Sequence, residues 1–96
     1  MDIKYLLKEK REDILRIAKH YGAYNVRVFG SVARDESDSE SDVDFLVKLE
    51  PGTTLLKYTA LLRELQNLLD CNVDIVSEAG IRKKMRDQVM REAVVL

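Results

Sequence analysis

The sequence predicts an α+β fold, a small mixed β-sheet flanked by helices in the order α-β-β-α-β-α. Three short runs of β-branched, aromatic and leucine residues, bounded by Gly, Ser or Asp, are typical of strands. Around them, apolar residues recur at three- and four-residue spacing, as in helices that pack on one side. The chain has 96 residues, of which 46% are hydrophobic, so we expect one domain over residues 1–96 with one core.

The first helix is predicted over residues 2–21 from an apolar stripe with Lys and Glu between its members. Asp2 is suited to cap its start and Gly22 to end it. Lys10 and Arg11 interrupt the stripe, so we expect its first turns to fray or to meet a partner.

Two further helices follow from turn and capping signals. Pro51-Gly52 predicts a turn, after which Thr53 or Thr54 can cap a helix that runs to about Leu69. The last helix is predicted from about Gly80 to Glu92, and the final apolar residues form a stub or a short edge strand. The expected inner face of this last helix is Ile81, Met85 and Val89, and the stub is Val94, Val95 and Leu96.

Composition limits the cellular setting and the partners. The chain has 16 Lys and Arg against 17 Asp and Glu, a net charge of −1, so nothing favours a nucleic-acid backbone as partner. The single cysteine, Cys71, excludes an internal disulfide and suits a reducing compartment. There is no signal peptide and no apolar run long enough to span a bilayer. We therefore expect a cytoplasmic protein that binds neither membrane nor nucleic acid.

A pair of carboxylates begins the second predicted strand. Asp42 and Asp44 are two residues apart, so on a strand they project from the same face, and Val43 and Phe45 point toward the core. Neighbouring carboxylates repel each other unless a cation lies between them, and oxygen ligands of this kind suit Mg²⁺. The alternative is that Asp42 caps a turn and Asp44 faces solvent.

A glycine-serine pair ends the first strand. Gly30 allows the backbone to approach a bulky anion, and the Ser31 hydroxyl with free N–H groups can hold phosphate oxygens. No Gly-Lys-Ser/Thr follows, so this is not a Walker loop, and taken alone the pair is usually an ordinary turn. Its position ten residues before the paired carboxylates places a phosphate cradle beside a metal site.

The third predicted strand, Val73-Asp74-Ile75-Val76, carries an acidic residue in an apolar run. Such a residue is unfavourable unless something pairs with it. If this strand lies next to the one that bears Asp42 and Asp44, Asp74 completes a cluster of three carboxylates. The alternative is a surface Asp at a strand edge.

These residues resemble the GSxAR…SDxD signature of the nucleotidyltransferase superfamily related to DNA polymerase β. The resemblance covers nearly the whole chain, and its length and form look like the smallest branch, the MNT-domain proteins (MntA-type antitoxins paired with HEPN toxins). The family often has glycine after the arginine, whereas this chain has Asp35 and an acidic loop over residues 35–40. The matching residues are Gly30, Ser31, Ala33, Arg34, Ser41, Asp42 and Asp44.

The resemblance implies a polymerase β-like fold and transfer of a nucleotide from ATP to an acceptor hydroxyl, with release of pyrophosphate. Gly30 and Ser31 would bind the phosphates, and Arg34 would add positive charge or brace the loop. The resemblance also implies two Mg²⁺ ions, held by the three catalytic carboxylates Asp42, Asp44 and Asp74. Asp74 would in addition help to remove the acceptor proton.

Three strands and three helices leave no residues for a domain that binds the acceptor. We therefore expect a protein partner to present it, and the resemblance implies AMP transfer to a tyrosine of a HEPN-domain toxin, in a hetero-oligomer. The rival hypothesis is a non-catalytic antitoxin that neutralises its partner by contact alone. A stand-alone transferase for a small molecule is disfavoured, since nothing here would enclose one.

Overall fold

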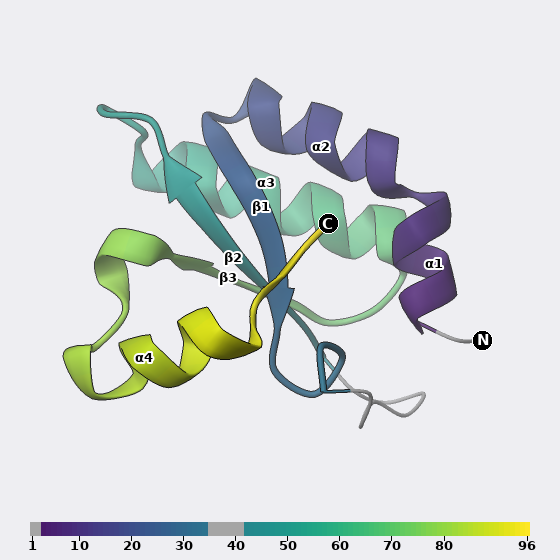
Figure 1. Cartoon of the computed structure of the whole chain (residues 1–96). Helices are drawn as coiled ribbons and strands as arrows, with labels where there is room; N and C mark the ends of the chain where they lie inside the picture. Colours follow the sequence, from purple (N-terminus) through teal and green to yellow (C-terminus); the bar gives the residue numbers. More distant parts are fainter. Residues whose placement is uncertain (1–2, 35–41) are drawn as a thin grey trace.

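The computed structural model describes residues 3–34 and 42–96. In it, four strands form one mixed sheet in the order β3-β2-β1-β4 (Figure 1). Strand β2 pairs antiparallel with β1 and parallel with β3, and β4 pairs antiparallel with the other edge of β1. The predicted α+β class and mixed sheet are confirmed. The strands are β1 (Ala23–Phe29), β2 (Val43–Leu49), β3 (Val73–Ser77) and β4 (Val94–Val95).

Helices α1, α2 and α3 pack against one face of the sheet, and α4 lies apart from them (Figure 1). No helix in the described part of the chain is long and apolar enough to cross a membrane. The helices are α1 (Ile3–Glu9), α2 (Arg11–His20), α3 (Leu55–Leu69) and α4 (Lys83–Glu92), with a short 3-10 helix η1 (Glu78–Gly80).

The single N-terminal helix predicted from the stripe is wrong: the chain forms two helices, α1 and α2, joined at Lys10. Leu7 and Ile14 are buried on either side of the break. Lys10 falls three residues after Leu7 and four before Ile14, where a straight helix would bury it. The break keeps this charge out of the core. The predicted cap, Asp2, lies outside the described residues.

The C-terminal helix starts later than predicted. The Ser77 hydroxyl accepts a hydrogen bond of 3.1 Å from the Gly80 N–H, and this cap closes a separate 3-10 turn before α4 begins. Val89 is buried as expected, and Ile81 is half-buried ahead of the helix. Met85 is 55% exposed, so its place on the inner face was wrongly predicted. The expected edge strand is confirmed as β4.

Helix α3 has the predicted limits. Thr54 caps it, since its hydroxyl accepts a hydrogen bond of 3.2 Å from the Lys57 N–H. The helix ends at Leu69, followed by Asp70 in the left-handed conformation. The predicted turn before it contains Gly52 at φ +85°, a conformation that favours glycine.

Strand β1 contains a bulge. Tyr24 and Arg27 are three residues apart but face partners on β2 that are two apart, so β1 holds one extra residue. Asn25 adopts φ +50° within this segment. The extra residue shifts the alternation of side chains, and both Ala23 and Val26 are therefore buried on the core face.

The main core lies between this face of the sheet and helices α1 to α3. Val43 and Phe45 are fully buried in it, as predicted for the residues that alternate with the carboxylates. The other sheet residues in this core are Ala23, Val26, Val28, Val47, Val73 and Ile75, and the helices contribute Ile3, Leu7, Ile14, Ala18, Leu61, Leu65 and Leu69.

The opposite face carries a polar anchor for η1 and α4. The Arg27 guanidinium lies 2.7 Å from the Glu78 carboxylate, and both side chains are about 15% exposed or less. Arg27 also donates to the Met90 sulfur at 3.8 Å, and Arg86 lies 3.7 Å from Glu78. Because burial weakens solvent screening, this pair contributes more than a surface ion pair.

Substituting Arg27→Met should lower the free energy of unfolding by about 2 kcal/mol, because Glu78 loses its main charged hydrogen bond. Urea denaturation measures the change. The control is Arg16→Met, which breaks an exposed pair with Asp13 (side chains 73% and 44% exposed) and should cost ~0.5 kcal/mol or less. Equal losses of stability in the two variants would show that the Arg27–Glu78 pair contributes no more than a surface ion pair.

The hydrogen bond from Arg27 is the main cause that lowers the pKa of Glu78 below its ordinary 4.5. The folded state therefore binds this proton more weakly than the unfolded state. The stabilisation is complete above pH 4.5 and is lost as pH falls through the lower, folded value. The stability difference between wild type and Arg27→Met should narrow over that acidic range.

Candidate active site

The segment after β1 forms a single tight turn. Gly30 adopts φ +76°, and its carbonyl accepts a hydrogen bond of 3.1 Å from the Arg34 N–H. Val32 is 1% exposed in the main core, which anchors the turn from below, and Ser31 is half-buried. The turn is thus fixed by one apolar side chain and one backbone hydrogen bond.

Gly30 is packed directly against Asp44. The β1–β2 register pairs Phe29, the last residue of β1, with Asp44, so Gly30 directly after the strand lies next to this carboxylate. A Cβ placed on Gly30 would collide with the Asp44 Oδ2. Because Gly30 has no side chain, the turn can pack directly against Asp44. From the sequence we expected the glycine turn and the carboxylates to be neighbours, but not this direct contact.

Strand β3 lies beside β2, as the three-carboxylate hypothesis requires, and its register pairs Asp74 directly with Asp44. Asp42 precedes β2, and both Asp42 and Asp74 are exposed. Burial is the largest cause that raises the pKa of Asp44 above its ordinary 3.8, followed by the charges of Asp74 and Asp42, while Arg34 opposes the shift. The acidic residues of the site are therefore close enough to act on one another.

The carboxylates form an open arrangement. Within residues 3–34 and 42–96, no three His, Cys, Asp or Glu side chains converge on one metal position. The charges of Asp74 and Asp42 each act on Asp44, and Asp74 is its register partner on β3. Mg²⁺ usually takes one or two protein carboxylates and leaves its other positions to water and phosphate oxygens. The donor set fits that requirement.

Arg34 meets a residue that the sequence analysis missed. Its Nη1 lies 3.1 and 3.0 Å from the two carboxylate oxygens of Glu92, the last residue of α4. Gln88 donates to Glu92 Oε1 at 3.2 Å. The one signal in the sequence is composition: Glu92 is one of only two acidic residues in an otherwise basic helix.

The pKa of Glu92 is lowered, first by the hydrogen bond from Gln88, although burial opposes the shift. The hydrogen bond and charge of Arg34 lower the pKa further, and so does the backbone N–H of Gly30. The contact with Arg34, at the end of the Gly30 turn, places the Glu92 carboxylate beside the turn that the sequence predicts to bind phosphate.

Two side chains border the acidic group without joining it. The Tyr58 hydroxyl donates to the Ile75 carbonyl, and burial followed by the charge of Asp74 raises its pKa. Cys71 is half-buried before β3, and burial followed by the charge of Asp42 raises its pKa. The raised pKa values favour the neutral form of both side chains.

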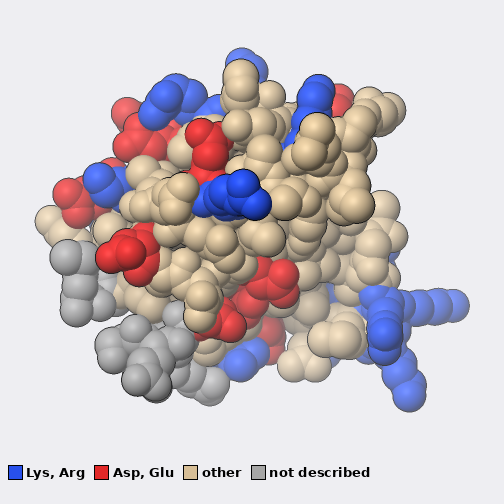
Figure 2. Space-filling model, turned by 180° about the vertical axis from the view of Figure 1, so that it is seen from behind, with Lys and Arg blue, Asp and Glu red and all other residues tan. Residues whose placement is uncertain are grey.

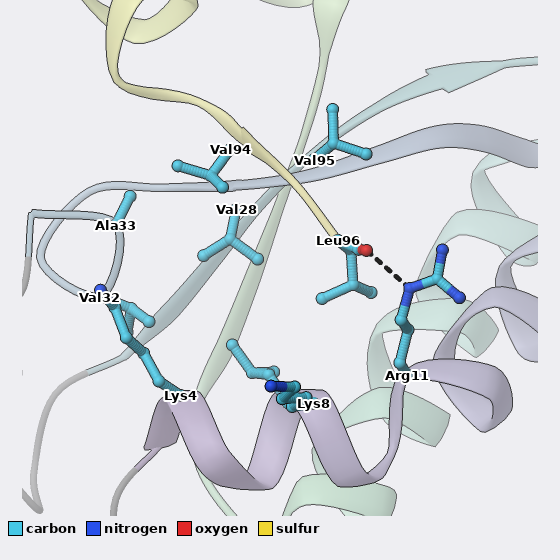
Figure 3. A pocket seen from close by; sticks show the side chains of 10 residues that line it. Lys4, Lys8, Arg11, Val28, Val32, Ala33, Val94, Val95 and Leu96 are labelled. Carbon is cyan, nitrogen blue, oxygen red and sulfur yellow. Dashed lines mark hydrogen bonds between the residues drawn. The ribbon is translucent and has the colours of Figure 1, made fainter.

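A pocket of about 300 Å³ lies behind the turn, between α1 and the β1–β4 edge (Figure 3). Val28 and Val32 form part of its floor, and Arg11 donates to the Leu96 carbonyl at 2.7 Å beside it. None of the acidic site residues line it. Its full lining is Lys4, Leu7, Lys8, Arg11, Val28, Val32, Ala33, Val94, Val95 and Leu96.

Surface charge is mixed. Figure 2 shows acidic and basic side chains interspersed over the rear face. Basic side chains project at its lower right, which corresponds to the lower left of Figure 1, where α4 is drawn. This distribution agrees with the net charge of −1. Helix α4 is the most basic element, with Lys83, Lys84, Arg86 and Arg91.

Comparison with known proteins identifies the class. The model of the nucleotidyltransferase domain family matches residues 7–96. A solved structure described as a minimal nucleotidyltransferase is 48% identical and superposes with a TM-score of 0.88, covering 100% of this chain and 97% of that one. The chain therefore belongs to the nucleotidyltransferase domain family and is a nucleotidyltransferase of the minimal type.

Two further relatives refine the comparison. The protein adenylyltransferase MntA of Thermococcus cleftensis is 35% identical over an alignment of 94 residues, and the match covers 93% of this chain and 95% of that protein. A toxin–antitoxin structure with AMP-PNP has the same fold, with a TM-score of 0.75 at 20% identity, covering 88% of this chain and 69% of that one. The polymerase β-like fold implied by the resemblance is confirmed.

Substituting Gly30→Ala should destabilise the protein by about 2–4 kcal/mol, because it adds both left-handed backbone strain and the collision with Asp44. The matched control is Gly52→Ala: Gly52 also has positive φ, but nothing lies within 4 Å of an added Cβ. That change should cost only ~1 kcal/mol. Equal losses in chemical denaturation would show that contact with Asp44 is unimportant.

Substituting Asp44→Asn should raise the melting temperature in metal-free buffer. The raised pKa means that the folded state holds the Asp44 proton more tightly than the unfolded state does, so ionisation above pH 3.8 destabilises the fold. As pH rises from 3.8 through the raised pKa of Asp44, the wild-type protein should lose stability, and the variant should lose less. The control is the exposed Asp87→Asn on α4, which should leave the melting temperature close to that of wild type. A lower melting temperature for Asp44→Asn would contradict the proposed repulsion.

Proposed function

We propose that this protein is an Mg²⁺-dependent protein adenylyltransferase that transfers AMP from ATP to a tyrosine hydroxyl of a HEPN-domain toxin and thereby acts as an antitoxin. The observation that carries the proposal is the contact between the Gly30 turn and Asp44, with Asp74 directly beside it. A phosphate-binding turn and carboxylates at one edge of the sheet are what nucleotidyl transfer needs.

The relatives support the adenylyl donor and the kind of acceptor. The MntA relative, similar over nearly its whole length, is named as a protein adenylyltransferase. The solved toxin–antitoxin complex with the same fold contains AMP-PNP. The HEPN partner and the tyrosine acceptor come from the family resemblance of the GSxAR…SDxD residues.

In the proposed reaction, the Gly30 and Ser31 amides and the Ser31 hydroxyl hold the β- and γ-phosphates, and Arg34 adds positive charge or braces the turn. Two Mg²⁺ ions would be held by the carboxylates of Asp42, Asp44 and Asp74. Bound metal would neutralise the carboxylates and stabilise the charge that develops on the entering and leaving oxygens.

The step itself is a displacement at phosphorus. The acceptor oxygen forms a bond to the α-phosphorus while the bond from that phosphorus to the β-bridging oxygen breaks, and pyrophosphate leaves. The acceptor proton passes to Asp74, whose exposed position at the sheet edge admits a protein partner. The open carboxylate group is thus suited to an acceptor presented from outside the chain.

The test is intact-mass spectrometry of the protein with its genomic neighbour's product, ATP and Mg²⁺. We expect mass gains of whole AMP units on the partner, lost on chelation of the metal and reduced by about 10²-fold or more in rate by Asp44→Asn. Asp87→Asn is the charge-matched control and should transfer AMP at the wild-type rate.

Each other outcome has a definite meaning. A tight complex without any mass gain under any nucleotide would favour the antitoxin that neutralises by contact alone. A mass gain that survives in Asp44→Asn would remove the carboxylates from the catalytic role. A gain on an acceptor other than tyrosine, located by fragmentation of the modified peptide, would keep the transferase but correct the acceptor.

A further inference from the structure

The Glu92 carboxylate lies where the incoming nucleotide needs cationic and N–H donors. Both of its oxygens lie within 3.1 Å of Arg34 Nη1, and its side chain is only 20% exposed. The backbone N–H of Gly30, which belongs to the proposed phosphate cradle, also stabilises its charge. In the described part of the chain, an acidic side chain thus already uses donors that the triphosphate would use.

Two anions do not share these donors without a penalty. The triphosphate carries several negative charges, and a carboxylate at the same guanidinium and the same turn repels it. A single guanidinium has five N–H donors, so geometry alone does not prevent sharing, but the like charges oppose it. Movement of Glu92 therefore favours nucleotide binding.

The position of Glu92 makes such movement easy. It is the last residue of α4, and the next residue has an extended backbone. Its other side-chain partner is Gln88, one turn earlier in the same helix, at 3.2 Å. Strand β4 holds the backbone from two residues further on, so a change of the Glu92 side-chain rotamer is enough to withdraw the carboxylate.

We propose that Glu92 is an internal competitor of the nucleotide: it occupies the Gly30 turn and Arg34 when ATP is absent and must leave when the triphosphate binds. The inference rests on the proposed nucleotide site and adds a residue that sets its affinity. Glu92 thereby stabilises the empty turn and weakens ATP binding through the same contacts.

The test is isothermal titration of the full chain with ATP and Mg²⁺, comparing wild type with Glu92→Gln. The variant keeps the shape and removes the charge, so it should bind ATP roughly three- to tenfold more tightly. Without nucleotide it should melt at a lower temperature than wild type, because the ion pair with Arg34 is lost. Tighter binding with lower intrinsic stability is the signature of a competitor.

Asp87→Asn is the matched control, since it removes one negative charge from the same helix at an exposed position. It should change the ATP affinity by less than about twofold. If it tightens binding as much as Glu92→Gln does, the effect is general electrostatics and the inference is overturned.

The remaining outcomes separate this inference from the proposed function. If wild type binds ATP and Glu92→Gln binds it equally or more weakly, Glu92 is a brace for Arg34, and only the inference fails. If neither protein binds ATP, the nucleotide site and the inference are both overturned. Binding by Glu92→Gln alone would support both.

Discussion

The parallel pairing of β2 with β3 is the constraint on which the site depends. It opposes Asp44 to Asp74 at the same register position, on the face turned away from the main core. A shift of one residue would send one carboxylate into the hydrophobic core, where an unpaired charge is highly unfavourable. The fully buried Val43 and Phe45 resist that shift, so the packing of one face fixes the acidic chemistry of the other.

The same arrangement sets function against stability. Burial and two neighbouring charges disfavour the ionised form of Asp44, and Gly30 adopts a conformation that few residues tolerate. Packing below the turn, where Val32 is almost completely buried in the core, offsets the unfavourable environment of Asp44. Ion pairs of Arg27 and Arg34 hold the C-terminal segment, whose helix contributes little apolar packing of its own.

Much of this was predictable from the sequence, because it depends on local periodicity. The period of two placed Asp42 and Asp44 on one face, and capping signals located α3 closely. The break at Lys10 was visible as an interrupted stripe, but only packing on both sides decides that the helix bends there. The contact between Arg34 and Glu92 joins residues 58 positions apart. No local sequence pattern predicts such a pair. The two residues are brought together by tertiary structure, because the C-terminal segment returns to the edge of β1 as β4.

The bulge in β1 has a consequence for how the length of this strand can vary. Tyr24 and Arg27 each keep a partner on β2, and Asn25 supplies the residue that the ladder does not need. Removing one residue at this point would leave a regular ladder with every other pairing and every side-chain face unchanged. The Asn25 carbonyl, however, accepts a hydrogen bond from Arg27 Nε at 3.1 Å. Deletion of one residue is therefore compatible with the sheet register at this point, and its effect reaches the C-terminal helix through the orientation of Arg27, which contacts Met90 of α4.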